Sequence, residues 1–277
     1  AGTKGELTGN LFIGGRLDAP EIRGDARLQG FSAELPALGV KLTGGDFLLR
    51  GEADGQARIT GQVTSGSGQL RVEGSLNLRD GSSPLELSLR GENVTVARTP
   101  DMDATMSPDL RLRYVDGSLQ IRGEVEVPTA RVDLERLDHS VSPSLDVVVL
   151  DPQPVPSQFV FPVDIDVQLR LGNAVRLRGF GLDGTLGGSL HIRDRPGRAA
   201  QANGTLTVAG KYSAYGQALT ITRGRLDYVN AAYDDPVLDI QAEREFRDGT
   251  DITVGIRVRG SALAPETSIT SSPAMST

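Results

Sequence analysis

Few side chains in this 277-residue chain could carry chemistry. Its two histidines are His139 and His191, and it has no cysteine. Neither histidine has a second metal-binding residue at a spacing typical of a transition-metal site. His139 lies in a polar stretch and His191 falls on the polar side of an alternating segment, so solvated histidines are the simpler interpretation. The sequence therefore predicts no metal and no cofactor.

Two acidic pairs are further candidates for catalysis, Asp164 with Asp166 and Asp234 with Asp235. Acid–base catalysis needs carboxylates that are buried in a cleft. The first pair alternates with apolar residues, which is typical of the solvent face of a strand, and the second precedes Pro236 in a turn. Since no nucleophile elbow and no phosphate-binding P-loop occurs either, we expect a protein that is not an enzyme.

Residues 179–184, Gly-Phe-Gly-Leu-Asp-Gly, match a dinucleotide-binding fingerprint. That fingerprint requires a helix after the glycines, because the start of the helix binds the phosphates. Residues 185–192 alternate between polar and apolar types, as a strand does. The string is therefore interpreted as a glycine-rich hairpin.

The elements that carry these residues are predicted to be strands. Residues 69–79 and 163–171 alternate strictly between apolar and polar side chains, and similar runs recur along the chain. Successive side chains of a strand point to opposite faces, so this pattern makes a sheet with one apolar and one polar face. About eighteen short segments, separated by turn pairs such as Asp80-Gly81, Asp116-Gly117, Asp183-Gly184 and Asp248-Gly249, favour an antiparallel meander.

Helix is scarce in this pattern. Ala130, Leu134, Leu137 and Val141 fall at helical spacing, but a strand fits the same stretch and is preferred. Prolines concentrate between residues 140 and 162, where they prevent regular ladder bonding and indicate a crossing loop or a seam. A lesser break spans residues 99–108. We therefore divide the chain into an N-terminal β-repeat segment, 1–98, and a C-terminal segment, 99–277, with the proline-rich loop near 140–162.

Charge and composition exclude several classes. The net charge of −7 disfavours binding to nucleic acid and to anionic membrane surfaces. No apolar run is long enough for a transmembrane helix, and the first residues show no signal peptide. Glycine is frequent, at 34 residues, and tryptophan is absent, so the apolar face is built from Leu, Val and Ile. The lack of cysteine suits an oxidising compartment.

The C-terminal third resembles the TamB family. Residues 204–228, 235–242 and 272–276 carry the resemblance, and Tyr-Ser-Ala-Tyr-Gly-Gln at 212–217 is its most specific part. Residues 142–150 and 175–184 also fit the C-terminal domain of that family, whereas residues 1–98 resemble it only as glycine-punctuated strands. For residues 212–217 a contact site is the alternative to a structural corner between two strands, which we favour, with Gly216 at a positive φ.

The resemblance implies an AsmA-like, bridge-like lipid-transfer protein of a Gram-negative bacterium, anchored in the inner membrane and crossing the periplasm to an outer-membrane barrel partner, TamA. Its implied fold is an elongated, curled antiparallel sheet, the β-taco, an open trough with an apolar interior. Roles ascribed to the family are phospholipid movement and assistance to outer-membrane protein insertion. An amphipathic segment that follows residues 272–276 in the family is missing here, so we expect a fragment that lacks the anchor and the TamA-docking segment.

An all-β sheet with one apolar face must bury that face, either in a closed sandwich or in a trough filled by a ligand. Few aromatics, many glycines within strands and no helix for a lid favour the trough. The expected function is a periplasmic trough that binds acyl chains and conducts phospholipid between the two membranes as part of the translocation and assembly module. The alternative is a chaperone for β-barrel client proteins by strand augmentation. A filled structural stalk is the third possibility.

The apolar face supplies the candidate site. Its residues are expected to contact acyl chains, and they are Leu70, Val72, Leu76, Leu78, Leu85, Leu87, Leu110, Leu112, Leu119, Ile121, Val125, Val163, Ile165, Val167, Leu169, Leu171, Val175, Leu177, Leu186, Leu190, Leu206, Val208, Leu219, Ile221, Ile252, Val254, Ile256 and Val258.

Overall fold

The structure is a computed structural model that describes residues 2–16, 19–52, 55–77, 79, 84–137, 162–214, 216–246 and 252–273. Its strands are β1 (Thr3–Arg16), β2 (Ala19–Leu35), β3 (Val40–Gly51), β4 (Gln56–Ser65), β5 (Gly68–Asn77), β6 (Leu85–Glu92), β7 (Val94–Arg98), β8 (Met102–Val115), β9 (Ser118–Asp133), β10 (Val163–Gly179), β11 (Leu182–Asp194), β12 (Gln201–Ala214), β13 (Gln217–Ala231), β14 (Val237–Phe246), β15 (Ile252–Ser261) and β16 (Ala264–Ser272). A 3-10 turn, η1 (Pro36–Leu38), and one helical turn, α1 (Leu134–Leu137), complete the described elements.

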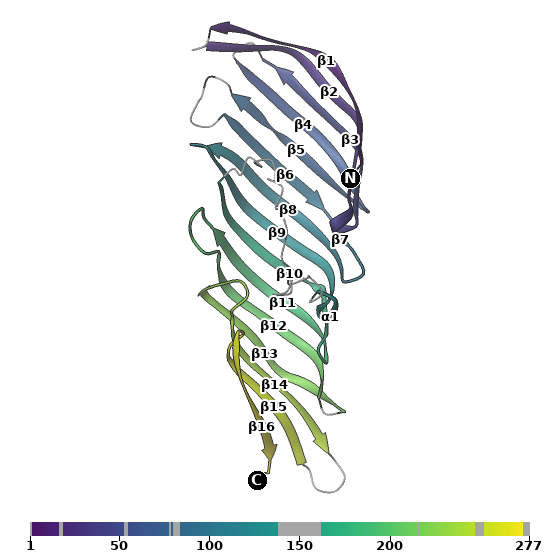
Figure 1. Cartoon of the computed structure of the whole chain (residues 1–277), viewed down its shortest axis with the longest axis vertical. Helices are drawn as coiled ribbons and strands as arrows, with labels where there is room; N and C mark the ends of the chain where they lie inside the picture. Colours follow the sequence, from purple (N-terminus) through teal and green to yellow (C-terminus); the bar gives the residue numbers. More distant parts are fainter. Residues whose placement is uncertain are drawn as a thin grey trace, which may run out of the picture.

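All sixteen strands belong to one sheet, which confirms the predicted all-β fold. The sheet order follows the chain order except that β7 leaves the path and pairs only with β8. In Figure 1 the strands stack along the long axis of the molecule, from β1 at one end to β16 at the other, so the body is elongated. The strands cross this axis obliquely, and successive turns therefore form two long rims.

One pair departs from the expected antiparallel meander. β9 and β10 run parallel, with Val163 opposite Leu119 and Leu177 opposite Val132. The chain thus leaves the sheet at one rim after Asp133 and re-enters it at the other rim at Val163. Alternation could not reveal this, because parallel and antiparallel strands place successive side chains on opposite faces alike. The predicted proline-rich loop lies almost wholly outside the described residues.

The predicted break at residues 99–108 is wrong in its extent. Only residues 99–101 form a turn, and β8 continues through Pro108. Pro108 is tolerated because it lies at an irregularity in the neighbouring ladder, where β6 ends opposite Asp109 and β7 begins opposite Met106. The expected division of the chain into two segments, between residues 98 and 99, falls at this turn. β7 precedes the turn, β8 follows it, and the two strands pair with each other.

Two other local predictions, one after Ala130 and one at Asp183-Gly184, are wrong. The stretch from Ala130 is strand only as far as Asp133, and α1 follows. Asp183-Gly184 lies within β11 and is not a turn. The glycine-rich hairpin itself is confirmed, and its two-residue turn is formed by Phe180 and Gly181, whose φ angles of 50° and 83° suit a tight hairpin.

The specific string at residues 212–217 also forms a hairpin. β12 ends at Ala214, which pairs with Gln217 at the start of β13, and Gly216 has the expected positive φ, 75°. Tyr215 lies outside the described residues. The structure therefore has the predicted corner between two strands.

Candidate functional site

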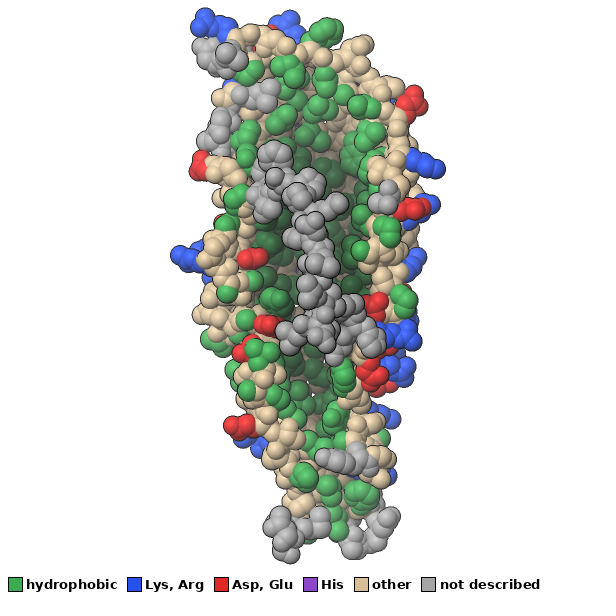
Figure 2. Space-filling model, in the orientation of Figure 1, with side chains coloured by type: hydrophobic (Ala, Val, Ile, Leu, Met, Phe, Trp, Pro, Cys, Tyr) green, Lys and Arg blue, Asp and Glu red, His purple; other side chains and the backbone are tan. Residues whose placement is uncertain are grey.

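The sheet is curled so that its apolar face forms a long groove. Figure 2 shows hydrophobic side chains gathered in a hollow that runs along the long axis, while charged side chains lie on its margins. In the described part of the chain, no second sheet and no helix longer than four residues faces this hollow. We call this face the groove and the opposite one the outer face.

The predicted residues of the first half lie side by side on the groove face. Leu76 is opposite Leu85, Leu87 is opposite Leu112, and Leu112 is also opposite Ile121. Leu70, Val72, Leu110, Leu119 and Val125 occupy the same phase of their strands. Leu78 lies outside the described residues. Most of these side chains are half-buried, although no second layer of described residues covers them.

The predicted residues of the second half continue the same face. Ile165 pairs with Ile121, Leu169 with Leu190, and Leu186 with Val208. After Leu171 the pairing between β10 and β9 shifts by one residue, and the alternation of β9 relative to the groove is reversed there. Val175 and Leu177 of β10 remain on the groove side. The remaining predicted residues share this face through their strand pairings: Val163, Val167, Leu171, Leu206, Leu219, Ile221, Ile252, Val254, Ile256 and Val258.

The groove deepens into a partly open apolar pocket in its C-terminal half, which we call the C-terminal cavity. It has a volume of about 430 Å³ and is lined by Leu134, Leu177, Gly179, Phe180, Leu182, Leu186, Leu206, Val208, Tyr212, Ile221, Leu226, Tyr228, Ile240, Ala242, Ile256 and Val258. These residues come from α1 and from every strand between β10 and β15. A volume in this range is typical of small-molecule sites.

Several cavity residues were absent from the predicted set. Leu182, Leu226 and Ile240 continue the alternation, so the pattern already contained the signal for them. Leu134 and Phe180 could not be found in this way, because they project from a helical turn and a hairpin turn at the rim. The N-terminal strands also contribute groove residues that were not predicted, such as Ile22 and Phe47, which lie on the groove side of β2 and β3.

The outer face is covered by cross-strand ion pairs. Examples are Arg27 with Asp46 at 2.6 Å, Arg90 with Asp109 at 3.2 Å, and Arg223 with Asp239 at 2.8 Å. Most of these side chains are substantially exposed, so each pair contributes little to stability on its own. The consequence is a hydrated outer surface against an apolar groove.

The histidine and the acidic pairs lie where the sequence placed them. His191 and Asp166 share the outer face, with His191 Nε2 2.5 Å from Asp166 Oδ1, and Arg193 lies 3.4 Å from Asp166 Oδ2. The hydrogen bond from His191, followed by the charges of His191, Arg193 and Arg122, lowers the pKa of Asp166. Asp235 accepts hydrogen bonds from Ser261 and from the backbone N–H of Leu263, which ties two turns together. Both acids are therefore engaged in structural contacts.

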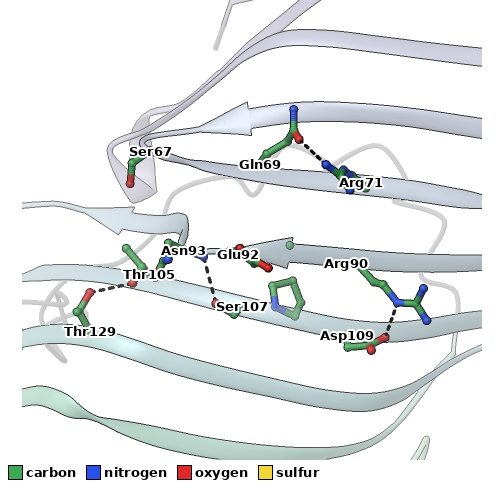
Figure 3. Close-up of a pocket in the computed structure, with 12 residues that line it drawn as sticks. Ser67, Gln69, Arg71, Arg90, Glu92, Asn93, Thr105, Ser107, Asp109 and Thr129 are labelled. Atoms are coloured by element: carbon green, nitrogen blue, oxygen red, sulfur yellow. Dashed lines mark hydrogen bonds and ion pairs between the residues drawn. The ribbon is translucent and has the colours of Figure 1, made fainter.

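A larger hollow, of about 860 Å³, lies on the outer face where β6 gives way to β7. Figure 3 shows four interactions among its polar residues. Arg90 donates to Asp109, the backbone N–H of Asn93 donates to Ser107, and the hydroxyls of Thr105 and Thr129 lie 2.8 Å apart. Several of its polar groups are thus engaged with one another, and we place the candidate site in the groove instead.

Two further properties of the described residues bear on other chemistry. They contain no group of three or more His, Cys, Asp or Glu side chains that could hold a metal ion. None of their helices is sufficiently long and apolar to span a membrane.

Known proteins that resemble this chain identify its family. Residues 59–277 match the family model described as the TamB C-terminal domain. The translocation and assembly module subunit TamB of Haemophilus influenzae is 27% identical to this chain over 285 aligned residues, which cover 97% of the chain and 22% of that relative. The chain thus spans about a fifth of the relative's length. The one-sided sheet, the groove and the extent of the family match together show that the chain belongs to the TamB C-terminal domain family.

Proposed function

We propose that this chain is part of a periplasmic trough that shields phospholipid acyl chains and conducts them between the inner and outer membranes. In this proposal it acts without catalysis, within a translocation and assembly module. The full-length protein is anchored in the inner membrane of a Gram-negative bacterium and engages TamA at the outer membrane. Family membership supports the role in the module.

The observation that carries the proposal is the continuous apolar groove. It runs from strand to strand along the molecule without a covering layer among the described residues, as Figure 2 illustrates. An exposed apolar surface of this extent marks a binding surface. Acyl chains suit it because each buried methylene contributes about 0.8 kcal/mol and needs no directional partner.

The construction of the two faces supports a conduit rather than a single pocket. Ion pairs cover the outer face, whereas Leu, Val and Ile repeat at every strand crossing of the groove. An acyl chain could therefore move along equivalent positions with a small change in free energy at each step. Repeated weak contacts of this kind favour movement, since each single apolar contact is weak and needs no directional partner.

The second candidate function is strand augmentation of outer-membrane β-barrel clients. It is favoured by the edges of the sheet, because among the described strands β1 and β16 each pair on one side only. β1 is the longer of the two at 14 residues, and all of its side chains are exposed. An unpaired edge is a template for another strand.

Native mass spectrometry distinguishes the two functions. Protein purified without detergent from a Gram-negative host is expected to carry phospholipid, and Leu169→Asp is expected to remove most of it. Ser189→Asp, on the outer face of the adjacent strand β11, serves as the matched control and is expected to keep the lipid. Wild-type protein that is lipid-free yet retains an unfolded barrel precursor would favour the chaperone function instead.

A further inference from the structure

Arg244 is out of place on an apolar face. The groove-facing residues of β14 are Leu238, Ile240 and Ala242, and alternation puts Arg244 next on that face. Its partner on β15 is Val254, which lies between Ile252 and Ile256 on the groove side. The strand pairing and the alternation therefore agree that this guanidinium stands at the groove.

Charged residues are rare at such positions. In the strands that the structure describes, the register puts only two charged residues on the groove side. They are Asp194, the last residue of β11, and Arg244. Asp194 ends β11 at one rim, and Arg244 stands near the opposite rim. Arginines elsewhere on the strands, such as Arg259, lie on the outer face beside carboxylates.

Among the described residues, the contacts of Arg244 are to a neutral amide and an aromatic ring. Its guanidinium donates to the side-chain oxygen of Gln217 and lies over the ring of Phe246, with Cζ 5.0 Å from the ring centroid. No carboxylate of a described residue forms an ion pair with it. Arginine is well suited to phosphate because its planar group offers several donors in a fixed arrangement.

Arg244 also adjoins the C-terminal cavity. Ala242 and Ile256 line that cavity, and Arg244 follows Ala242 by two residues, about 7 Å farther along the strand. The cavity volume of about 430 Å³ lies in the range of sites that hold small molecules, so it can accommodate an acyl chain. An apolar cavity with an arginine farther along one of its lining strands is complementary to an amphiphile with an anionic head.

We propose that Arg244 binds the phosphate of a phospholipid whose acyl chain occupies the C-terminal cavity. This inference rests on the proposed function and assigns a headgroup contact to it. Phe246 and Gln217 position the guanidinium, while Ile240, Ala242 and Ile256 contact the chain. The site would make the groove selective for anionic or zwitterionic phosphate-bearing lipids at this point.

The test compares decyl phosphate with decanol, two ligands with the same chain, by displacement of an apolar fluorescent dye. Arg244→Gln is expected to weaken decyl phosphate about tenfold, the effect of losing one charge-assisted contact, and to leave decanol unchanged. Arg244→Lys is expected to restore part of the loss, because it returns the charge. Arg259→Gln, which removes an outer-face arginine, is the matched control and is expected to change neither ligand.

Each of the other outcomes would contradict the role of Arg244, the role of the lipid chain or the proposed function. Equal weakening of both ligands by Arg244→Gln would make Arg244 a structural residue, and no weakening would remove it from the site. Inorganic phosphate that competes as strongly as decyl phosphate would show a free-anion site with no part for the lipid chain. Failure of the wild-type protein to bind either ligand would overturn the proposed function itself.

Discussion

Gly188 of β11 lies directly opposite Leu206 of β12, on the groove side of the sheet. A Cβ at Gly188 would stand 2.3 Å from the carbonyl oxygen of Thr205 and 3.1 Å from Leu206 Cα. The φ of Gly188 is +116°, which side-chain-bearing residues rarely adopt. The missing side chain lets two strands approach closely while the neighbouring leucine fills the space, and this allows the sheet to curl around the groove.

Gly188→Ala is therefore expected to destabilise the protein by about 2 kcal/mol or more. The added Cβ would clash with the carbonyl oxygen of Thr205, so the backbone of one strand would have to move. Denaturant unfolding followed by circular dichroism measures the loss. Gly187→Ala is the control, since it lies on the outer face and its nearest contact would be 3.5 Å, with the Thr207 hydroxyl. Equal losses for the two variants would contradict the account.

A charge placed in the groove should spare the fold. Leu169 and Ile256 are half-buried and face the hollow, so Leu169→Asp or Ile256→Arg leaves the new charge in reach of water. We expect a loss of about 1–2 kcal/mol in the free energy of unfolding, from lost apolar burial, and at least tenfold weaker binding of an acyl ligand. Circular dichroism and dye displacement measure the two effects. Global unfolding of both variants would indicate a closed core.

The elongated shape is testable in solution. Fifteen strands follow one another along the sheet, so at about 4.8 Å per step the stack is roughly 70 Å long. A compact globule of 277 residues would have a radius of gyration of about 19 Å. Small-angle X-ray scattering of the monomer is expected to give a clearly larger value. A radius at the compact value would reject the open sheet.

Stability should fall in acid through Asp166. Because its pKa is lowered in the folded protein, chiefly by the hydrogen bond from His191, the contribution is present above the unfolded pKa of 3.8 and is lost as the pH falls from there through the folded pKa. Asp166→Asn is expected to reduce the free energy of unfolding at pH 7 and to flatten its decline below about pH 4. Denaturant titrations of both proteins at a series of pH values check this, and parallel curves would contradict it.

Much of the local structure could be predicted from alternation alone. The strict pattern of residues 69–79 corresponds to β5, and that of residues 163–171 corresponds to the first part of β10. The face of His191, the turn at Gly216 and the common face of the predicted leucines followed from the same period of two. The expected eighteen segments became sixteen strands, since short apolar runs do not reveal where one strand ends and the next begins.

By itself, the sequence determined which side of each strand is apolar, because that depends only on the order of neighbouring residues. The parallel pairing of β9 with β10, the open groove and the place of Arg244 beside the C-terminal cavity were decided only by the tertiary structure. These features depend on strand register and on the curl of the sheet, which bring together residues far apart in the chain. A one-residue change of register would turn a side chain from the groove to the water, so no local pattern could have specified them.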